Sequence, residues 1–335
     1  MMTLDELKDY LATPKNVVIT THQKPDGDAM GSSLALYNYL TDKGHYCRVI
    51  TPTEYPDYFK WMPGEEFTYN YLEEENLSKI AIAEANIIFC LDFNELSRIS
   101  PVDIPVVANE NAKLVLIDHH INPMEAVDFS LHDVKASSTC ELIHRFITMI
   151  EPNFQFTKAI ATCIYTGILT DTGGFSNGAT NKAALEITAQ LLDCGLDMMA
   201  VQNELNQNSR EERLRFIGNA LNRKMFIHED LALGYIRIDR KDVYKYNLKT
   251  GETEGLVNYP LSIKAVKVAV LLKEEKNMIK LSFRSKDDIS VQEICSTYFE
   301  GGGHRNASGG KSFLSMEDTI QKLLKIFKDL KLSSQ

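Results

Sequence analysis

Residues 16–30 read NVVITTHQKPDGDAM, and this stretch decides the fold. The run NVVITT is short, apolar and rich in β-branched side chains, which is typical of a buried parallel strand. It is followed by a polar loop that holds His22, Asp26 and Asp28. The next segment, residues 29–44, has apolar side chains at helical spacing and ends at Gly44. A strand, a loop and a helix in this order predict a βα unit of an α/β fold with a mainly parallel, doubly wound sheet.

Acidic residues and histidines recur after two further apolar runs. Asp92 follows ANIIFCL, and Asp118 follows KLVLI and precedes His119 and His120. A helix is predicted over residues 156–171, with Thr157 as its N-cap and Asp171 at its end. Because the carboxyl ends of parallel strands form the ligand crevice of an open α/β sheet, we expect these polar residues to converge on one small volume.

Several carboxylates at one place repel one another unless cations offset their charge. Asp26 and Asp28 are two residues apart in a loop, so their side chains can face two different ions, and His22 can join one of them. Each motif alone also has a plainer interpretation: a polar turn for HQKPDGD, a surface pair for the two histidines, and a helix or strand cap for Asp92 or Asp171. Their joint occurrence favours a metal site.

The composition is that of a globular protein with room for two domains. The chain has 335 residues, of which 44% are hydrophobic and 24% are charged, and its formal net charge is −10. Residues 226–335 hold 18 Lys and Arg against 15 Asp and Glu, whereas residues 1–225 hold 18 against 31. This balance argues against binding of a long nucleic acid. The sequence shows no membrane span and no CxxC pair, so we expect a cytoplasmic protein with reduced cysteines.

Three parts are predicted along the chain: a catalytic domain over residues 1–190, a helical linker over 191–226 and a smaller α/β domain over 227–335. In the last part, strands are expected at residues 231–238, 266–272 and 278–285, and helices at 288–300 and 315–330. The segment GGGHRNASGG, residues 301–310, lies between these helices. Three consecutive glycines let backbone N–H groups approach a phosphate, although a flexible turn is the alternative.

The order HxxxDxD, strand-ending Asp, DHH and DTGGF resembles the DHH phosphoesterase superfamily, which includes RecJ exonucleases and class II inorganic pyrophosphatases. The resemblance covers roughly residues 15–180. It implies two Mn²⁺ ions, one held by His22, Asp26 and Asp92 and the other by Asp28, Asp92, His119 and Asp171. Asp92 would then bridge the ions. Asp118 would orient the imidazole of His119, and His120 would contact the scissile phosphate, which makes Asp92, Asp118 and His120 the expected catalytic residues.

The second half resembles the DHH-associated domain, on the strength of SFRS and GGGHRNASGG. This implies substrate binding by Arg284, Gly301, Gly302, Gly303 and His304, with the active site in the cleft between the domains. The length and the domain order are most similar to those of NrnA-type oligoribonucleases. The resemblance therefore implies Mn²⁺-dependent hydrolysis of short RNA, and of 3′-phosphoadenosine 5′-phosphate (PAP), by a hydroxide that bridges two metal ions.

Two alternatives stay open at this point. Related proteins with the same two domains hydrolyse cyclic di-AMP or its linear product, and a degenerate relative could bind a nucleotide without cleaving it. The expected partner is a short RNA or a small nucleotide, with no long nucleic acid and no membrane. A homodimer through exposed apolar helix faces also stays open.

Overall fold

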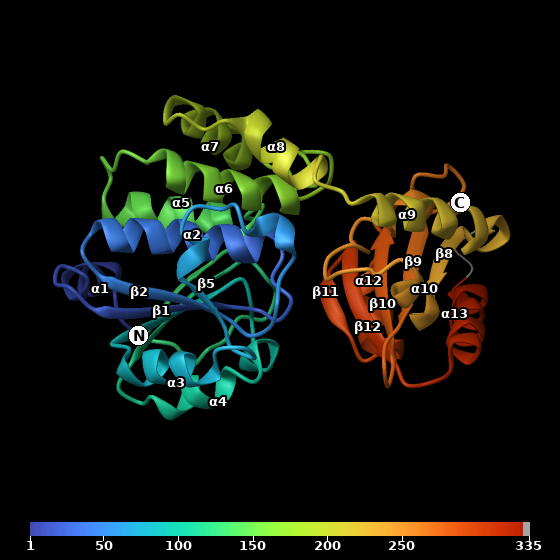
Figure 1. Cartoon of the computed structure of the whole chain (residues 1–335), viewed down its shortest axis with the longest axis horizontal. Helices are drawn as coiled ribbons and strands as arrows, with labels where there is room; N and C mark the ends of the chain where they lie inside the picture. The colour runs from blue at the N-terminus through green and yellow to red at the C-terminus, as the bar shows by residue number, and fades with distance from the viewer. Residues whose placement is uncertain (331–335) are drawn as a thin grey trace. The chain divides into compact units, whose positions relative to one another are not determined.

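The computed structural model describes residues 1–330 (Figure 1). The chain divides into two compact units, Met1–Asn208 and Ser209–Gln335. Each unit has a six-stranded sheet covered by helices, which confirms the predicted α/β fold. Among residues 1–330, no helix combines the length and the apolar character that crossing a membrane requires.

The sheet of the first unit is entirely parallel and has the order β3-β2-β1-β4-β5-β6. Its strands are β1 Asn16–Thr21, β2 Tyr46–Thr51, β3 Thr68–Asn70, β4 Ile87–Leu91, β5 Lys113–Asp118 and β6 Phe129–His132. The chain leaves β1 in one direction and returns to β4 on its other side, so the strand order reverses between these two strands. The doubly wound topology is confirmed, and the reversal marks the place where such sheets bind ligands.

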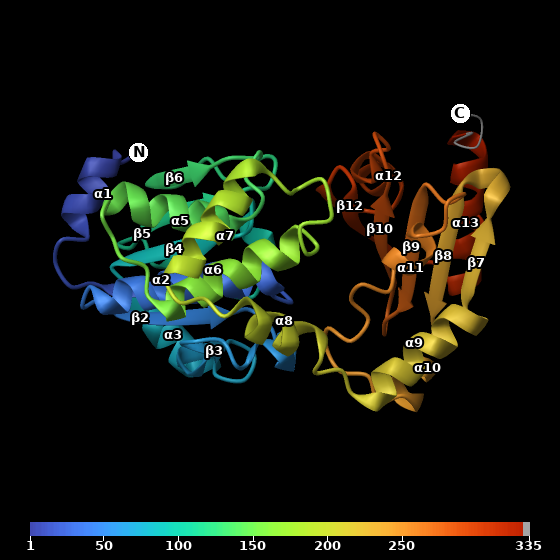
Figure 2. The ribbon, with the colours of Figure 1, turned by 90° about the horizontal axis from the view of Figure 1, so that it is seen from above.

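Helices cover both faces of this sheet, and the alternation of side chains along β1 shows why. Val17 and Ile19 join the core on one face, whereas Val18 joins the core on the other. One face is covered by α2 Gly27–Asp42 and α5 Thr139–Ile150, and α6 Lys158–Asp171 and α7 Lys182–Asp193 pack on these helices (Figures 1 and 2). The other face is covered by α3 Glu75–Glu84 and α4 Asp103–Ala108. The unit is completed by α1 Leu4–Tyr10, α8 Met198–Asn206 and the short 3₁₀ helices η1 Asp57–Phe59, η2 Glu65–Phe67 and η3 Leu96–Ile99.

The sheet of the second unit is mixed and has the order β11-β12-β10-β9-β8-β7. Only the β8–β9 pair is parallel. Its strands are β7 Met225–His228, β8 Leu233–Ile238, β9 Val268–Glu274, β10 Ile279–Ser285, β11 Gly302–His304 and β12 Ala307–Ser312. Helices α12 Val291–Tyr298 and α13 Met316–Leu330 pack on one face of this sheet, and α9 Glu211–Arg223, α10 Arg240–Lys245 and α11 Asn258–Leu261 lie on the other, with η4 Glu229–Leu231 before β8.

Two parts of the second unit differ from the sequence interpretation. The segment GGGHRNASGG forms a β-hairpin, β11–β12, at the edge of the sheet instead of a loop. Helix α9 lies in the predicted linker, but its Phe216 and Ala220 are buried with Ile236 and Ile238 of β8. This helix is therefore a structural part of the second unit.

Candidate active site

Eight polar side chains meet at the carboxyl edge of the first sheet, where the strand order reverses. They come from the ends of β1, β4 and β5, from the start of α2 and from the end of α6. The members are His22, Asp26, Asp28, Asp92, Asp118, His119, His120 and Asp171. The structure thus brings together all the residues that the sequence predicted to converge there, although they span 150 positions of the chain.

The first group consists of His22, Asp26 and Asp92, whose ligand atoms lie within 4.8 Å of one another. His22 Nε2 lies 3.4 Å from Asp92 Oδ2 and 3.8 Å from Asp26 Oδ2. His22 Nδ1 lies 2.8 Å from the carbonyl oxygen of Gln23. A proton on Nδ1 satisfies that carbonyl, so Nε2 is the ring nitrogen that faces the two carboxylates and that a cation would use.

Asp26 and Asp28 separate for a reason that the sequence interpretation missed. They do not lie in an extended loop, because Asp26 is the N-cap of α2 and Asp28 belongs to its first turn. Asp26 Oδ1 accepts hydrogen bonds from the backbone N–H groups of Asp28 and Ala29, both at 3.0 Å. Its Oδ2 remains directed to His22. The capping geometry, not strand-like alternation, sends the two carboxylates to different groups.

The second group consists of Asp28, His119 and Asp171. His119 Nε2 lies 3.3 Å from Asp171 Oδ2, 3.6 Å from Asp92 Oδ1 and 3.9 Å from Asp28 Oδ2. His119 Nδ1 lies 3.3 Å from the carbonyl oxygen of Ala136, which again leaves Nε2 for the cluster. Asp92 therefore faces His22 with one oxygen and His119 with the other.

The close packing of α6 on α2 brings Asp171 and Asp28 to the same place. Gly167 of α6 makes this approach possible, since a Cβ at that position would collide with Cys140 Sγ and lie 2.7 Å from Asp28 Oδ1. A larger side chain would displace the carboxylate of Asp28. Gly167 is thus required by the packing at the site.

Asp118 does not orient the imidazole that was expected. Its Oδ1 lies 2.7 Å from Nδ1 of His120, whereas Nδ1 of His119 faces a backbone carbonyl. The interpretation that Asp118 orients His119 is therefore wrong. The physical reason is that consecutive residues after a strand point in different directions, so the ring two positions after Asp118 returns to it. Asp118 is fully buried and holds a proton of His120 in place.

The ionisation of the cluster reflects its burial. Burial and the nearby charge of Asp92 raise the pKa of Asp28. Burial alone would also raise the pKa of Asp92, but the hydrogen bond from His22 and the neighbouring imidazoles lower it. Burial disfavours a charged His22 and a charged His119, yet the surrounding carboxylates raise the pKa of both rings. Protons thus balance the charge of the buried acids, and a divalent cation can replace them.

Asp92 also has an unusual backbone. Its φ of 64° lies in the left-handed region, which aspartate tolerates better than most residues but which still carries strain. This conformation turns the chain sharply after β4 and keeps the carboxylate at the sheet edge. Strained residues of this kind concentrate at functional sites, and this one lies at the centre of the two groups.

The donor set fits divalent metal ions. Imidazole nitrogens and carboxylate oxygens converge in two groups, and Asp92 belongs to the first group while its other oxygen faces the second. Mixed nitrogen and oxygen donors suit Mn²⁺ and its neighbours in the first transition row. The residues present therefore fit a two-metal site.

One contributor to the site was not predicted. The backbone N–H groups of Thr139 and Cys140, at the start of α5, donate to the carboxylate of Asp28 at 2.6 and 2.9 Å. The pattern Ser138–Thr139–Cys140–Glu141, with Ser138 as N-cap, is a helix-start signal that could have indicated exposed N–H donors. Only the fold shows which carboxylate they meet.

The predicted substrate residues lie in the second unit. Arg284 of β10 and His304 of β11 both pair with Ala307 of β12, so all three positions share one face of the sheet. Gly301 and Gly303 are required by close packing in the hairpin: a Cβ on Gly301 would collide with the carbonyl oxygen of Gly309, and Gly303 has a φ of 138°. The glycine run thus has a structural role, and its part in substrate binding stays a prediction.

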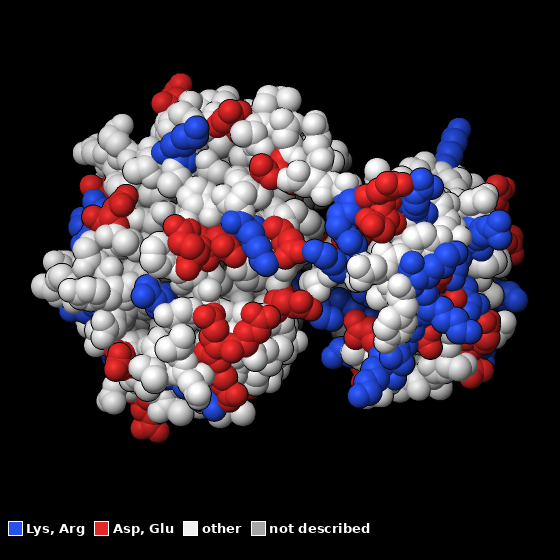
Figure 3. Space-filling model, in the orientation of Figure 1, with Lys and Arg blue, Asp and Glu red and all other residues white. Residues whose placement is uncertain are grey.

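The same face of this sheet carries a row of lysines. Lys280 of β10 pairs with Lys273 of β9 and with Lys311 of β12. This row places three basic residues side by side on one face of the sheet. Figure 3 shows many Lys and Arg side chains over the visible face of this unit and a band of Asp and Glu on the visible face of the first.

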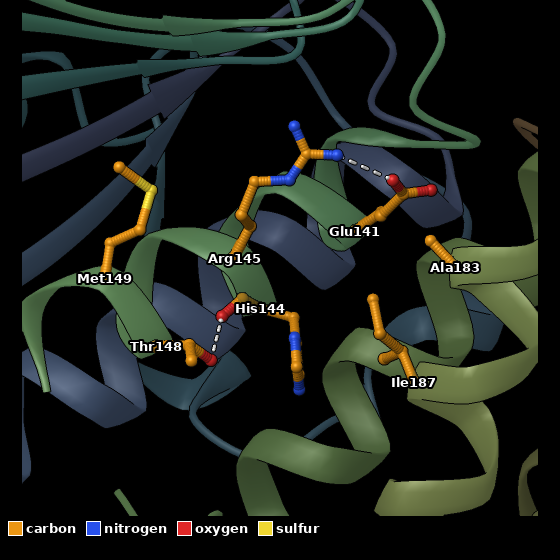
Figure 4. Close-up of a pocket in the computed structure, with 7 residues that line it drawn as sticks. All are labelled: Glu141, His144, Arg145, Thr148, Met149, Ala183 and Ile187. Carbon is orange, nitrogen blue, oxygen red and sulfur yellow. Dashed lines mark hydrogen bonds and ion pairs between the residues drawn. The ribbon is translucent and has the colours of Figure 1, made fainter. Parts of the chain in front are cut away.

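A separate pocket of about 240 Å³ lies between α5 and α7 (Figure 4). It is lined by Glu141, His144, Arg145, Thr148, Met149, Ala183 and Ile187. Burial lowers the pKa of His144 to about 4, against smaller opposing effects of Gln190 and Glu141, and Arg145 is paired with Glu141 at 3.0 Å. The imidazole of His144 is therefore neutral, and the guanidinium of Arg145 is already paired with Glu141. The pocket is a gap in the packing between two helices and not the candidate active site.

Comparison with known proteins agrees with this geometry. The model of the DHH family, N-terminal domain, matches residues 16–168, and the DHHA1 domain model matches residues 233–331. The chain belongs to the DHH family of phosphoesterases. Members of this family hydrolyse phosphoester bonds, so the chain is an enzyme of that class.

Full-length relatives share the two-domain arrangement. The "bifunctional oligoribonuclease and PAP phosphatase NrnA" of Thermus thermophilus is 26% identical over 314 residues, which cover 93% of this chain and 89% of that protein. The crystal structure of an exopolyphosphatase-related protein from Bacteroides fragilis is 35% identical, with a TM-score of 0.92, and the match covers 98% of this chain and 96% of that one. The cyclic-di-AMP phosphodiesterase GdpP of Bacillus subtilis is 24% identical over 95% of this chain but only 48% of its own length.

Proposed function

We propose that this protein is a two-metal phosphoesterase that hydrolyses short oligoribonucleotides to mononucleotides and removes a phosphate from PAP. The observation that carries the proposal is the split use of Asp92, whose Oδ2 faces His22 at 3.4 Å and whose Oδ1 faces His119 at 3.6 Å. A carboxylate between two donor groups is the arrangement that a pair of metal ions needs. The NrnA relative supports the substrate class.

Two Mn²⁺ ions are proposed as the cofactor. His22, Asp26 and Asp92 would hold one, and Asp28, Asp92, His119 and Asp171 would hold the other. When bound, the ions would lower the pKa of a water molecule and offset negative charge on the phosphate. The protein residues keep the donors in place and exclude bulk water from a site where His22, Asp92 and His119 are buried.

His120 is proposed to act on the scissile phosphate. Asp118 Oδ1 accepts a hydrogen bond from Nδ1, which fixes the orientation of the ring, and Nε2 is the atom proposed to contact the substrate. A proton donated from Nε2 would neutralise a phosphate oxygen or assist the leaving oxygen. No covalent bond between the protein and the substrate is needed.

The second unit would hold the rest of the nucleotide. Arg284 and His304 can pair with phosphate or stack on a base, and the lysine row, four residues along β10 from Arg284, can meet a further phosphate. At about 3.3 Å per residue, that separation is roughly 13 Å. Substrates of a few nucleotides would fit this length.

We place the enzyme in the cytoplasm. All six cysteines are free, and five of them are buried among apolar side chains. Free thiols in such positions are typical of proteins from reducing compartments.

A second candidate function is hydrolysis of cyclic di-AMP, and the observation that favours it is the similarity to GdpP. A third, nucleotide sensing without hydrolysis, is disfavoured because every predicted metal ligand is present and lies at the site. Both alternatives use the same residues as the proposed function. Hydrolysis of cyclic di-AMP differs from it in the substrate, and sensing differs from it in the absence of turnover.

The test is a parallel assay of the purified protein with MnCl₂ and four substrates: the dinucleotide pApA, PAP, cyclic di-AMP and pyrophosphate. We expect the highest kcat/KM for pApA, followed by PAP. A higher value for cyclic di-AMP would support the GdpP-like function, and binding of all four without turnover would support sensing. The matched inactive control is Asp92→Asn.

A further inference from the structure

The N-terminus of α5 lies against the candidate metal ligands. The backbone N–H of Thr139 donates to Asp28 Oδ2 at 2.6 Å, and that of Cys140 donates to Asp28 Oδ1 at 2.9 Å. Both oxygens of this carboxylate therefore have fixed partners. Because α5 is held in the core by Leu142, Ile143 and Phe146, the donors have little freedom to move.

Thr139 makes a second contact with the site. Its hydroxyl donates to Asp92 Oδ1 at 2.9 Å, and the residue is fully buried. One residue thus contacts two carboxylates that come from different elements, 47 and 111 positions earlier in the chain. Both carboxylates belong to the set that the proposed site assigns to the second ion.

The orientation of the Asp92 carboxylate needs such a partner. The terminal torsion of an aspartate side chain is broad, so the backbone alone does not fix the plane of the Asp92 carboxylate. Asp92 Oδ2 lies 3.4 Å from His22 Nε2, and Oδ1 lies 3.6 Å from His119 Nε2. The hydroxyl of Thr139, which donates to the oxygen that faces His119, fixes this plane, and a carboxylate oxygen has lone pairs for both a hydroxyl and a cation.

We propose that Thr139 is a positioning residue, whose hydroxyl sets the rotation of the Asp92 carboxylate so that its two oxygens serve two different metal ions. The inference rests on the proposed two-metal function. Thr139 does not itself coordinate metal or touch substrate in this role. Its backbone N–H and its hydroxyl act together, so that the geometry of Asp28 and Asp92 is linked through one residue.

The test is a titration of the metal-free protein with MnCl₂, followed by calorimetry and by EPR. Thr139→Val keeps the shape of the side chain and both backbone donors but removes the hydroxyl. We expect the Kd of one Mn²⁺ ion to rise 10- to 100-fold, as is usual when a partner of a metal ligand is lost, and the EPR signal of a coupled manganese pair to weaken. The concentration of Mn²⁺ needed for half-maximal activity should rise by the same factor.

The Ser and Ala variants at this position isolate the hydroxyl. Thr139→Ser and Thr139→Ala both lose the methyl group, so they differ only in the oxygen. We expect Ser to retain the wild-type affinities and Ala to behave as Val, and this pair decides the question even if the Val variant does not fold. Thr188→Val is the control, because Thr188 is a buried threonine of α7 whose hydroxyl donates to Ala184 at 2.7 Å.

The outcomes separate this inference from the proposed function. If the wild-type protein binds two Mn²⁺ ions and the Ala and Ser variants bind both with equal affinity, the role of Thr139 is overturned. If the wild-type protein binds fewer than two ions, the two-metal function itself is overturned, together with the inference that depends on it. A fall in thermal stability without any change in Mn²⁺ affinity would show a merely structural role and would also overturn it.

Discussion

The carboxylate of Asp118 lies 2.7 Å from Nδ1 of His120 and is fully buried. Asp118→Asn keeps an oxygen that can accept this hydrogen bond but removes the negative charge beside the ring. We expect kcat for pApA to fall by roughly 10- to 100-fold while KM and the number of bound Mn²⁺ ions stay the same. Steady-state kinetics and calorimetry measure these quantities.

A matched control for that prediction is Asp128→Asn. Asp128 pairs with Lys113 at 3.1 Å, so the same chemical change occurs outside the eight-residue cluster. A loss of Mn²⁺ binding in Asp118→Asn would contradict the proposed role, because it would make Asp118 a ligand and not a partner of His120.

Asp92→Asn should remove the pairing of the two metal ions. Asparagine tolerates the left-handed backbone at this position, so the substitution changes the charge without adding the strain that alanine would bring. We expect fewer than two Mn²⁺ ions per chain and a loss of activity of more than about 100-fold, with an unchanged far-UV circular dichroism spectrum. Full occupancy by two ions in this variant would rule out a bridging role.

Metal removal should lower stability as well as activity. A ligand that binds only the folded state stabilises it by about 2.7 kcal/mol at a concentration of 100 times its Kd. We therefore expect thermal unfolding to occur at a higher temperature in MnCl₂ than in EDTA, and the difference to be much smaller for Asp92→Asn. An equal increase of the unfolding temperature in both proteins would show that the stabilising ions bind outside the eight-residue cluster.

His144 should make the stability depend on pH. Burial lowers its pKa from 6.5 to about 4 in the folded protein. Since the folded pKa lies below the unfolded one, the neutral ring stabilises the fold fully above pH 6.5, and this contribution is lost as the pH falls from 6.5 towards 4. Over this whole pH range the contribution of His144 to the free energy of unfolding changes by about 3 kcal/mol.

The variant that tests this effect is His144→Phe, which can keep the stacking of His144 on Phe156, whose ring centroid lies 4.6 Å away. Urea unfolding at pH 7 and at pH 4.5 should show a smaller loss of stability for the variant than for the wild-type protein. An equal loss of stability between pH 7 and pH 4.5 in the variant and in the wild-type protein would show that other groups cause the pH dependence.

The lysine row should act on longer substrates. Lys280→Gln together with Lys311→Gln removes two charges from the face that carries Arg284, and we expect kcat/KM to fall several-fold for a tetranucleotide but to change little for pApA. The salt dependence of tetranucleotide binding should weaken by about 0.7 in log–log slope for each lysine that contacts a phosphate. The control is the double variant Lys325→Gln and Lys328→Gln. These two lysines are exposed on α13, which packs on the face of the sheet opposite the lysine row. An equal loss of kcat/KM for the tetranucleotide and for pApA would contradict the proposed role of the lysine row.

The sequence predicted the first unit well, because buried parallel strands are short apolar runs that can be recognised without their neighbours. NVVITT, ANIIFCL and KLVLI correspond to β1, β4 and β5, and Asp171 ends α6 as expected. The edge strands β3 and β6 were missed, since β3 has one apolar residue, Tyr69, and β6 has two, Phe129 and Leu131. Pairing with a neighbouring strand, not intrinsic propensity, makes these segments strands. The hairpin β11–β12 was missed because glycine-rich strands read as turns.

The convergence of eight polar residues was therefore determined by the sequence alone, through the periodicity that places each of them at a strand end or a helix end. Only the tertiary structure decided which atoms meet: that Asp26 caps a helix, that Asp118 pairs with His120 and not with His119, and that Thr139 reaches a carboxylate 47 positions earlier. The physical reason is that strand and helix patterns depend on neighbours along the chain, whereas a hydrogen bond depends on side-chain rotation and packing between elements that are distant in sequence.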